Sequence, residues 1–162
     1  LDLDEALRRV QSAFRVRPLT GDDLEGAVAA LDAAGTGTHP FVVTDGRTFA
    51  LIDDPSPEAV DAALPPKEHS SAWRSLDASV LHALVLDRLW GADDDSRRTA
   101  YVHDAAAAVR AATRAAGVAV LMRPVAVEVV QSLAARGERM PRKSTSFGPK
   151  PRTGLVLRLL DR

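Results

Sequence analysis

The spacing of hydrophobic residues along the chain predicts an alternation of helices and strands. Residues 3–10 place apolar side chains at helical spacing, and residues 14–19 alternate apolar and polar positions as a short strand does. A second helix is expected next, with Thr20 or Asp22 as its N-cap and Gly35 as its stop. A helix, a strand and a second helix are therefore expected before the first glycine-rich loop.

The next pattern predicts a β-hairpin near residues 40–53. Two apolar runs, at 41–44 and 48–52, flank the dipeptide Asp45-Gly46. This dipeptide is typical of tight hairpin turns because both residues tolerate positive φ angles.

Beyond the hairpin the periodicity changes, which predicts a division into sub-regions. Residues 57–64 are expected to form a short helix, and 65–75 contain prolines and polar residues without periodicity. We therefore expect an N-terminal sub-region at 1–64, a linker at 65–75 and a C-terminal α/β sub-region at 76–162.

The C-terminal sub-region predicts strands that alternate with helices. Asp77 is expected to cap a helix at 77–90, followed by a strand at 100–102, a helix at 104–116, a strand at 118–122, a helix at 124–135 and a strand at 153–159. This order is typical of parallel strands joined by helical crossovers. The predicted fold class is α/β, with a mixed sheet whose strands are mainly parallel in the C-terminal half.

Composition narrows the class of protein. The 162 residues are 46% hydrophobic and 27% charged, as expected for a globular domain with a substantial core. The absence of cysteine excludes disulfides and thiolate metal sites. No apolar run approaches the roughly 20 residues of a membrane span, and the first residues are acidic, so we expect a cytoplasmic protein without a membrane partner. Because the chain opens on Leu1, we expect either a piece of a longer protein or a processed chain.

Charge is distributed unevenly along the sequence. Residues 1–104 carry ten Lys or Arg against nineteen Asp or Glu, whereas residues 105–162 carry eleven against three. This asymmetry either draws the two parts together or marks the last third as the side that meets an anion. Nucleic-acid binding is not expected, because the basic residues are not interleaved with aromatic ones.

The strongest candidate site is the segment 140–155, here called the cationic segment. It combines cations, hydroxyls, prolines and glycines, and it holds two of the three lysines of the chain. We predict an anion cradle, in which ammonium charge and hydroxyl donors bind phosphate or carboxylate, formed by Arg142, Lys143, Ser144, Thr145 and Lys150. The alternative is a solvated basic loop. The glycine-rich pattern of a P-loop is absent.

The histidines do not predict a metal site, because their spacing is not that of metal-binding helices: His39, His69, His82 and His103. His82 is expected to be a partly buried, hydrogen-bonded residue and His103 to lie at a helix cap, and Trp73 is expected to cover the core rather than a ligand.

Five segments resemble, in order, the C-terminal region of the domain of unknown function 1015 family, a group of uncharacterised bacterial and archaeal proteins. They are LDASVLH at 76–82, YVHD at 101–104, LMRP at 121–124, GERMP at 137–141 and KSTSFGPKPRTGLV at 143–156. The last segment departs from the family pattern at Ser146 and Gly148, where that pattern has tyrosines, so any stacking by those rings is lost.

The resemblance implies an accessory domain of a larger enzyme. Family members are longer and carry an upstream motif similar to one in free-serine kinases, which implies a small-molecule phosphotransferase that uses ATP or another phosphate-bearing ligand. This chain alone is not expected to be active. The alternative hypothesis is a non-catalytic structural or interaction module that docks the missing N-terminal portion of its parent protein.

Overall fold

The computed structural model describes residues 1–21, 23–92, 99–141 and 144. The helices are α1 (Leu3–Val10), α2 (Leu24–Ala33), α3 (Pro57–Ala63), α4 (Ser71–Arg74), α5 (Asp77–Val80), η1 (Leu81–Leu89), α6 (Ala105–Ala115) and α7 (Val127–Ala135). The strands are β1 (Arg15–Pro18), β2 (Phe41–Thr44), β3 (Phe49–Asp53) and β4 (Ala119–Leu121). This content confirms the α/β class. Among the described helices, none has the length and apolar character that crossing a membrane requires.

The four strands form one sheet in the order β1-β3-β2-β4, and every neighbouring pair is antiparallel. Val16 of β1 lies opposite Ile52, Val42 of β2 lies opposite Leu51, and Val43 lies opposite Val120 of β4. The predicted hairpin is confirmed as the central β2–β3 pair.

The predicted parallel arrangement in the C-terminal half is wrong, because β4 pairs with β2 in the antiparallel direction. Helical crossovers do join parallel strands here: β1 and β2 are parallel to each other because both are antiparallel to β3. By the same logic β3 and β4 are parallel to each other across β2. A strand of the hairpin lies between the members of each pair, so no parallel strands are neighbours.

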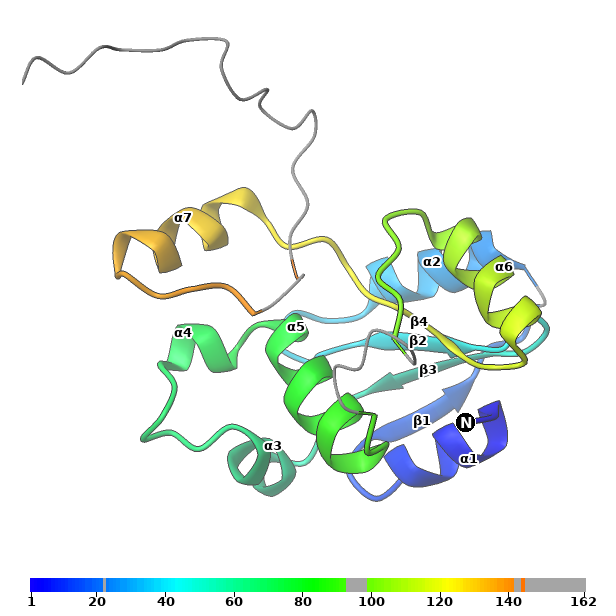
Figure 1. The fold of residues 1–162 in the computed structure, drawn as a ribbon, viewed down its shortest axis with the longest axis horizontal. Coiled ribbons are helices and arrows are strands. Elements are labelled where there is room, and N and C mark those ends of the chain that lie inside the picture. The colour runs from blue at the N-terminus through cyan, green and yellow to red at the C-terminus, as the bar shows by residue number, and fades with distance from the viewer. Residues whose placement is uncertain (22, 93–98, 142–143, 145–162) are drawn as a thin grey trace, which may run out of the picture.

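Helices cover both faces of the sheet (Figure 1). Phe41, Val43 and Ile52 pack in a core with residues of α1, α3 and η1. Val42, Phe49 and Leu51 pack on the opposite face with residues of α2 and α6. Every residue of β2 and β3 is buried. Burial of each large side chain stabilises the fold by about 1.5–3 kcal/mol, so the hairpin is the centre of the structure.

Two hydrogen bonds at the end of η1 connect this helix with α1. The Trp90 indole Nε1–H donates to the carbonyl of Ala6 at 3.1 Å, and Arg9 donates to the carbonyl of Trp90 at 3.0 Å. Trp90 is buried, so its hydrogen bond satisfies the one polar atom of a large apolar side chain. These contacts connect α1 with a helix about 80 residues later in the chain.

The hairpin turn differs from the expected two-residue form. Thr44 and Phe49 are the last paired residues, so four residues form the loop. Of Asp45 and Gly46, the two residues expected to form the turn, only Gly46 has a positive φ, +93°. Asp45 contributes through its side chain, which accepts hydrogen bonds from the backbone N–H groups of Arg47 and Thr48 at 2.9 Å. These bonds lower the pKa of Asp45, the bond from Thr48 contributing most.

The helix predicted over 77–90 changes its hydrogen-bond pattern at residue 81. The first turn is α5, and the remainder is the π-helix η1, in which the N–H of Trp90 donates to Val85 five residues earlier. Its apolar residues come in adjacent pairs, such as Leu84-Val85 and Leu89-Trp90, five positions apart. The wider π turn brings both pairs onto the core face, which an α-helix would not do.

Three smaller predictions were wrong. Asp23, not Thr20 or Asp22, caps α2. Leu76 is the N-cap of α5 and makes no side-chain cap bond, so Asp77 is not a cap. Residues 100–102 form no strand. The strand predicted at 153–159 lies outside the described residues, and the division at 65–75 stays a prediction.

The helix α7 lies apart from the sheet, on the side of α4 and α5 (Figure 1). Only Leu133 of this helix is buried, whereas Val127 and Val129 are 49% and 38% exposed. The chain returns from α7 toward α4, and this return leads into the cationic segment.

The turn of the hairpin generates a stability prediction. A Cβ atom on Gly46 would lie 2.1 Å from Oγ1 of Thr113, whose hydroxyl donates to Asp45 and Val109. Gly46→Ala should therefore combine backbone strain with loss of those bonds and destabilise the protein by about 2–4 kcal/mol in urea unfolding. Gly37→Ala is the matched control, since Gly37 has a φ of +79° with open space around it.

The control should cost only about 1–2 kcal/mol. In a Thr113→Ala background the cost of Gly46→Ala should fall to that of the control. Equal losses for Gly46→Ala and Gly37→Ala in the native background would contradict the close contact.

Candidate functional site

The two residues that lead into the cationic segment, Glu138 and Arg139, are attached to helix α4. The hydroxyl of Ser70 donates to the carboxylate of Glu138, and the indole Nε1–H of Trp73 donates to the carbonyl of Arg139 at 2.9 Å. Pro141, the next proline, is buried. The segment therefore leaves the body of the protein from a defined position.

Of the predicted site residues, the structure describes Ser144 alone. Its hydroxyl donates to the carbonyl of Pro141 at 2.6 Å, and its backbone N–H donates to the same carbonyl at 3.3 Å. This turn uses the hydroxyl hydrogen that the cradle hypothesis assigned to an anion. Outside the described residues lie Arg142, Lys143, Thr145 and Lys150.

Two aromatic rings stack at the same place. The rings of His69 and Trp73 are parallel within 12°, and their centroids are 4.3 Å apart. Both side chains are half-buried, so the stack lies at the surface rather than within the core. Trp73 also packs against the core, which matches the predicted covering role in part.

A second polar cluster joins three distant segments. The carboxylate of Asp77 pairs with Nδ1 of His39 at 2.9 Å and accepts a hydrogen bond from Arg123 at 3.2 Å. Arg123 also donates to the carbonyl of Ala34 at 3.2 Å. The side chains of His39, Asp77 and Arg123 are only 12%, 18% and 22% exposed, so solvent screens this network weakly.

This cluster escaped the sequence analysis. Asp77 at the start of a helix has the pattern of a cap, yet it bonds to His39 and Arg123 instead. His39 has a φ of +44°, a conformation that non-glycine residues adopt rarely and often at functional sites. A carboxylate that holds Nδ1 of a histidine orients the imidazole and leaves Nε2 as the atom that can exchange a proton. The sequence around Asp77 gives no signal from which its contacts with His39 and Arg123 could be predicted.

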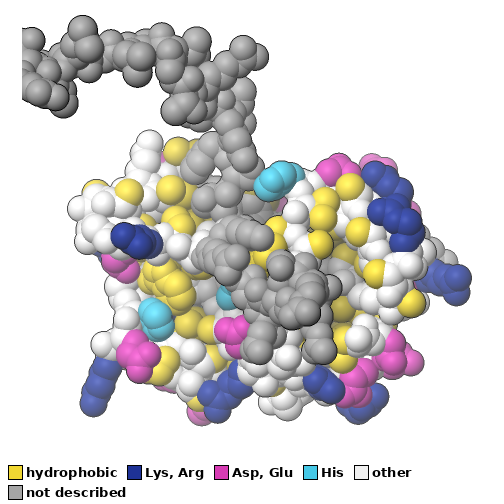
Figure 2. Space-filling model, in the orientation of Figure 1, with side chains coloured by type: hydrophobic (Ala, Val, Ile, Leu, Met, Phe, Trp, Pro, Cys, Tyr) yellow, Lys and Arg dark blue, Asp and Glu magenta, His cyan; other side chains and the backbone are white. Residues whose placement is uncertain are grey.

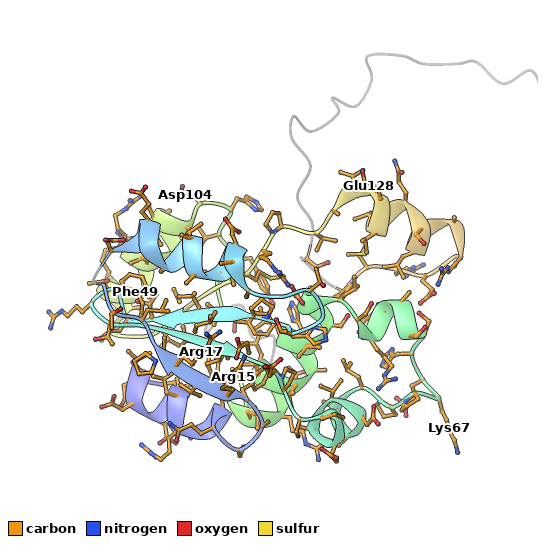
Figure 3. The ribbon with its side chains drawn as sticks, turned by 180° about the vertical axis from the view of Figure 1, so that it is seen from behind. Arg15, Arg17, Phe49, Lys67, Asp104 and Glu128 are labelled. Atoms are coloured by element: carbon orange, nitrogen blue, oxygen red, sulfur yellow. The ribbon has the colours of Figure 1, made fainter. Side chains whose placement is uncertain are left out.

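A third cluster holds the edge strand β1 to β3. Arg15 donates to both carboxylate oxygens of Asp53 at 2.8 and 3.1 Å, and Arg17 donates to the same side chain. Figure 3 shows Arg15 and Arg17 on the same strand, where their side chains lie close together. Burial of Asp53 acts to raise its pKa, but the hydrogen bonds and charges of the two arginines outweigh it, and the pKa is lowered.

The remaining histidines have structural surroundings. His82 stacks on Tyr101 with 5.8 Å between ring centroids. His103 is exposed and precedes Asp104, whose side chain caps α6 through the N–H of Ala107 at 2.7 Å. Among the described residues, no group of three or more His, Cys, Asp or Glu side chains could hold a metal ion.

A shallow hollow of about 260 Å³ lies beside the hairpin turn and is lined by Asp2, Asp45, Arg47 and Thr113 among others. The Asp45 carboxylate is already engaged by the turn, which explains the hollow as a by-product of hairpin packing. On the face shown in Figure 2, basic and acidic side chains are interspersed around the rim of the described part. The attachment of the cationic segment thus remains the leading feature.

The lowered pKa of Asp53 predicts acid sensitivity. A depressed carboxyl pKa stabilises the fold above the ordinary aspartate value of about 3.9, and this contribution is lost as the pH falls through the folded value. Asp53→Asn should cost about 1–2 kcal/mol at about pH 7, a modest figure because both arginines are half-exposed. In urea unfolding the difference from the wild type should shrink progressively as the pH falls below the ordinary aspartate value.

Asp54→Asn is the control, because Asp54 also pairs with Arg15 but is 46% exposed. Its effect should be a few tenths of a kcal/mol. A constant cost of Asp53→Asn across the acid range would contradict the ion pair.

The cluster at Asp77 predicts energetic coupling between residues 38 positions apart. A double-mutant cycle of His39→Ala and Asp77→Ala should give a coupling energy of about 0.5–2 kcal/mol in unfolding measurements, because each change removes the contact between the two side chains. A control cycle with the exposed His103 should be additive. Additivity in the His39 cycle would show that the contact carries no stability.

Comparison with known proteins adds no relative: no family model, curated protein or solved structure matches this chain. The site is therefore described from its own geometry.

Proposed function

We propose that this chain binds a phosphate- or carboxylate-bearing small molecule through its cationic segment. The segment 136–152 holds six Lys or Arg against one Glu, so several attractions add at one place. The residues assigned to the anion are Arg142, Lys143, Ser144, Thr145 and Lys150. Ser144 would turn its hydroxyl from Pro141 toward the ligand.

The observation that carries this proposal is the attachment of the segment to α4. Hydrogen bonds from Ser70 to Glu138 and from Trp73 to Arg139 hold the two residues directly before it. Glu138 is the one acid of the stretch, and its bond to Ser70 directs that charge toward α4. An anion site benefits when its cations start from a fixed frame, since less entropy is lost on binding.

The wider setting follows from the resemblance and is part of the same proposal. An accessory domain of a larger small-molecule enzyme would use this site to position phosphates, with ATP or another phosphate-bearing ligand as its partner. A bacterial source and a cytoplasmic location belong to this setting and stay predictions.

A second candidate function is supported by helix α7. This helix exposes Val127 and Val129 and buries only Leu133, which is unusual for a helix of such apolar composition. If α7 is an interaction surface, the domain docks the remainder of its parent protein through this helix, and the cationic segment contributes charge to the interface.

Pyrophosphate titration should separate the two candidates. Addition of millimolar pyrophosphate should raise the melting temperature of the wild-type chain, because a ligand that binds the folded state stabilises it. Lys143→Ala and Lys150→Ala should each reduce this rise by at least half. Arg114→Ala is the control, since Arg114 is an exposed cation on α6, which lies apart from α4 (Figure 1).

A response that survives both changes would refute the assigned lysines. The absence of any response in the wild type would favour the docking module.

A further inference from the structure

The His69–Trp73 stack lies where the cationic segment is attached to the body of the protein. Trp73 supplies both the ring of the stack and the donor that holds Arg139. We propose that this stack is the ring-binding part of the anion site, so that the ligand is a nucleotide or another molecule with a planar aromatic ring and an anionic group. This inference rests on the proposed function and specifies its ligand.

The stack has a fixed geometry before any ligand arrives. The indole N–H of Trp73 donates to Arg139 at 2.9 Å and holds the ring, while its backbone N–H donates to Ser70 at 3.0 Å and holds the main chain. The N–H of His69 donates to Pro65 at 3.3 Å. A preorganised planar surface binds a flat ring with little loss of entropy.

The exposure of the two rings distinguishes this stack from an ordinary core contact. The other tryptophan, Trp90, is 7% exposed and directs its N–H to Ala6 inside the protein. Trp73 instead lies half-buried, and its hydrogen bond to Arg139 is exposed. An aromatic pair at the surface next to cations is the arrangement that proteins use to bind nucleotides by stacking and charge together.

The charges around the stack favour an anionic ligand. Three exposed cations lie near the stack in the sequence or through the attachment. Lys67 precedes His69 by two positions, the backbone of Arg139 is bonded to Trp73, and Arg136 precedes Arg139 by three positions. Glu68 is the exposed acid beside them, and Glu138 is engaged by Ser70. Cations therefore outnumber free carboxylates around the stack, even without the cations of the cationic segment.

Tripolyphosphate and ATP form a matched pair of probes, since both carry a chain of three phosphates and only ATP has a ring. In isothermal titration calorimetry, the wild-type chain should bind ATP about 5- to 150-fold more tightly than tripolyphosphate, the range expected for one stacked base. His69→Ala should abolish this preference and leave the affinity for tripolyphosphate unchanged. His69→Phe should restore the preference, because it returns a planar ring.

Trp73→Phe provides a second test, because it keeps a ring and removes only the indole donor to Arg139. It should weaken ATP and tripolyphosphate by the same factor, as expected of a positioning residue. Circular dichroism verifies that each variant is folded.

The outcomes separate the two proposals. Equal affinity of the wild type for both probes, or a preference that survives His69→Ala, would overturn the stacking inference and leave anion binding intact. Failure of both probes to bind would overturn the proposed function and this inference with it.

Discussion

The burial of the β2–β3 hairpin on both of its faces is the constraint on which the whole structure depends. All nine positions of β2 and β3 are removed from water, so each face needs its own helical layer. The two remaining strands become the edges, and β1 has the features that discourage further pairing: Arg15, Arg17 and Pro18. Asp53, at the end of β3, joins the two arginines to the hairpin and so fixes this edge to the buried centre.

Local features of the fold could be predicted from the sequence, whereas strand pairing could not. The periodicity around Leu3 and the apolar runs beside Asp45-Gly46 depend on near neighbours, and their elements formed where expected. The direction of β4 depends on Val42 and Val43, which lie about 80 residues away. Unbroken apolar strands are typical of parallel sheets, because such sheets are covered on both faces. Here the same covering surrounds an antiparallel hairpin. The alternation of strands and helices, on which the prediction of parallel neighbours rested, is met by parallel strands that a hairpin strand separates.

The candidate sites show the same division between local and distant information. The cationic segment was visible in the sequence because composition alone marks it. Asp77 was not, since an acidic residue at a helix start has a sufficient local explanation as a cap. Only the folded chain brings His39 and Arg123 to it, from the loop before β2 and the loop after β4. The attachment of Arg139 to Trp73 is likewise a contact between residues 66 positions apart.

That attachment resolves a difficulty in the anion-binding hypothesis. Ser146 and Gly148 stand where the resembled family has tyrosines, so the cationic segment itself offers charge with one aromatic ring, that of Phe147. The structure places two rings, from His69 and Trp73, at the base of this segment. Charge without a ring would bind any phosphate of suitable size, whereas charge beside a fixed stack selects ligands by shape as well. The hydrogen bond between Trp73 and Arg139 is the element that would make these two parts act as one site.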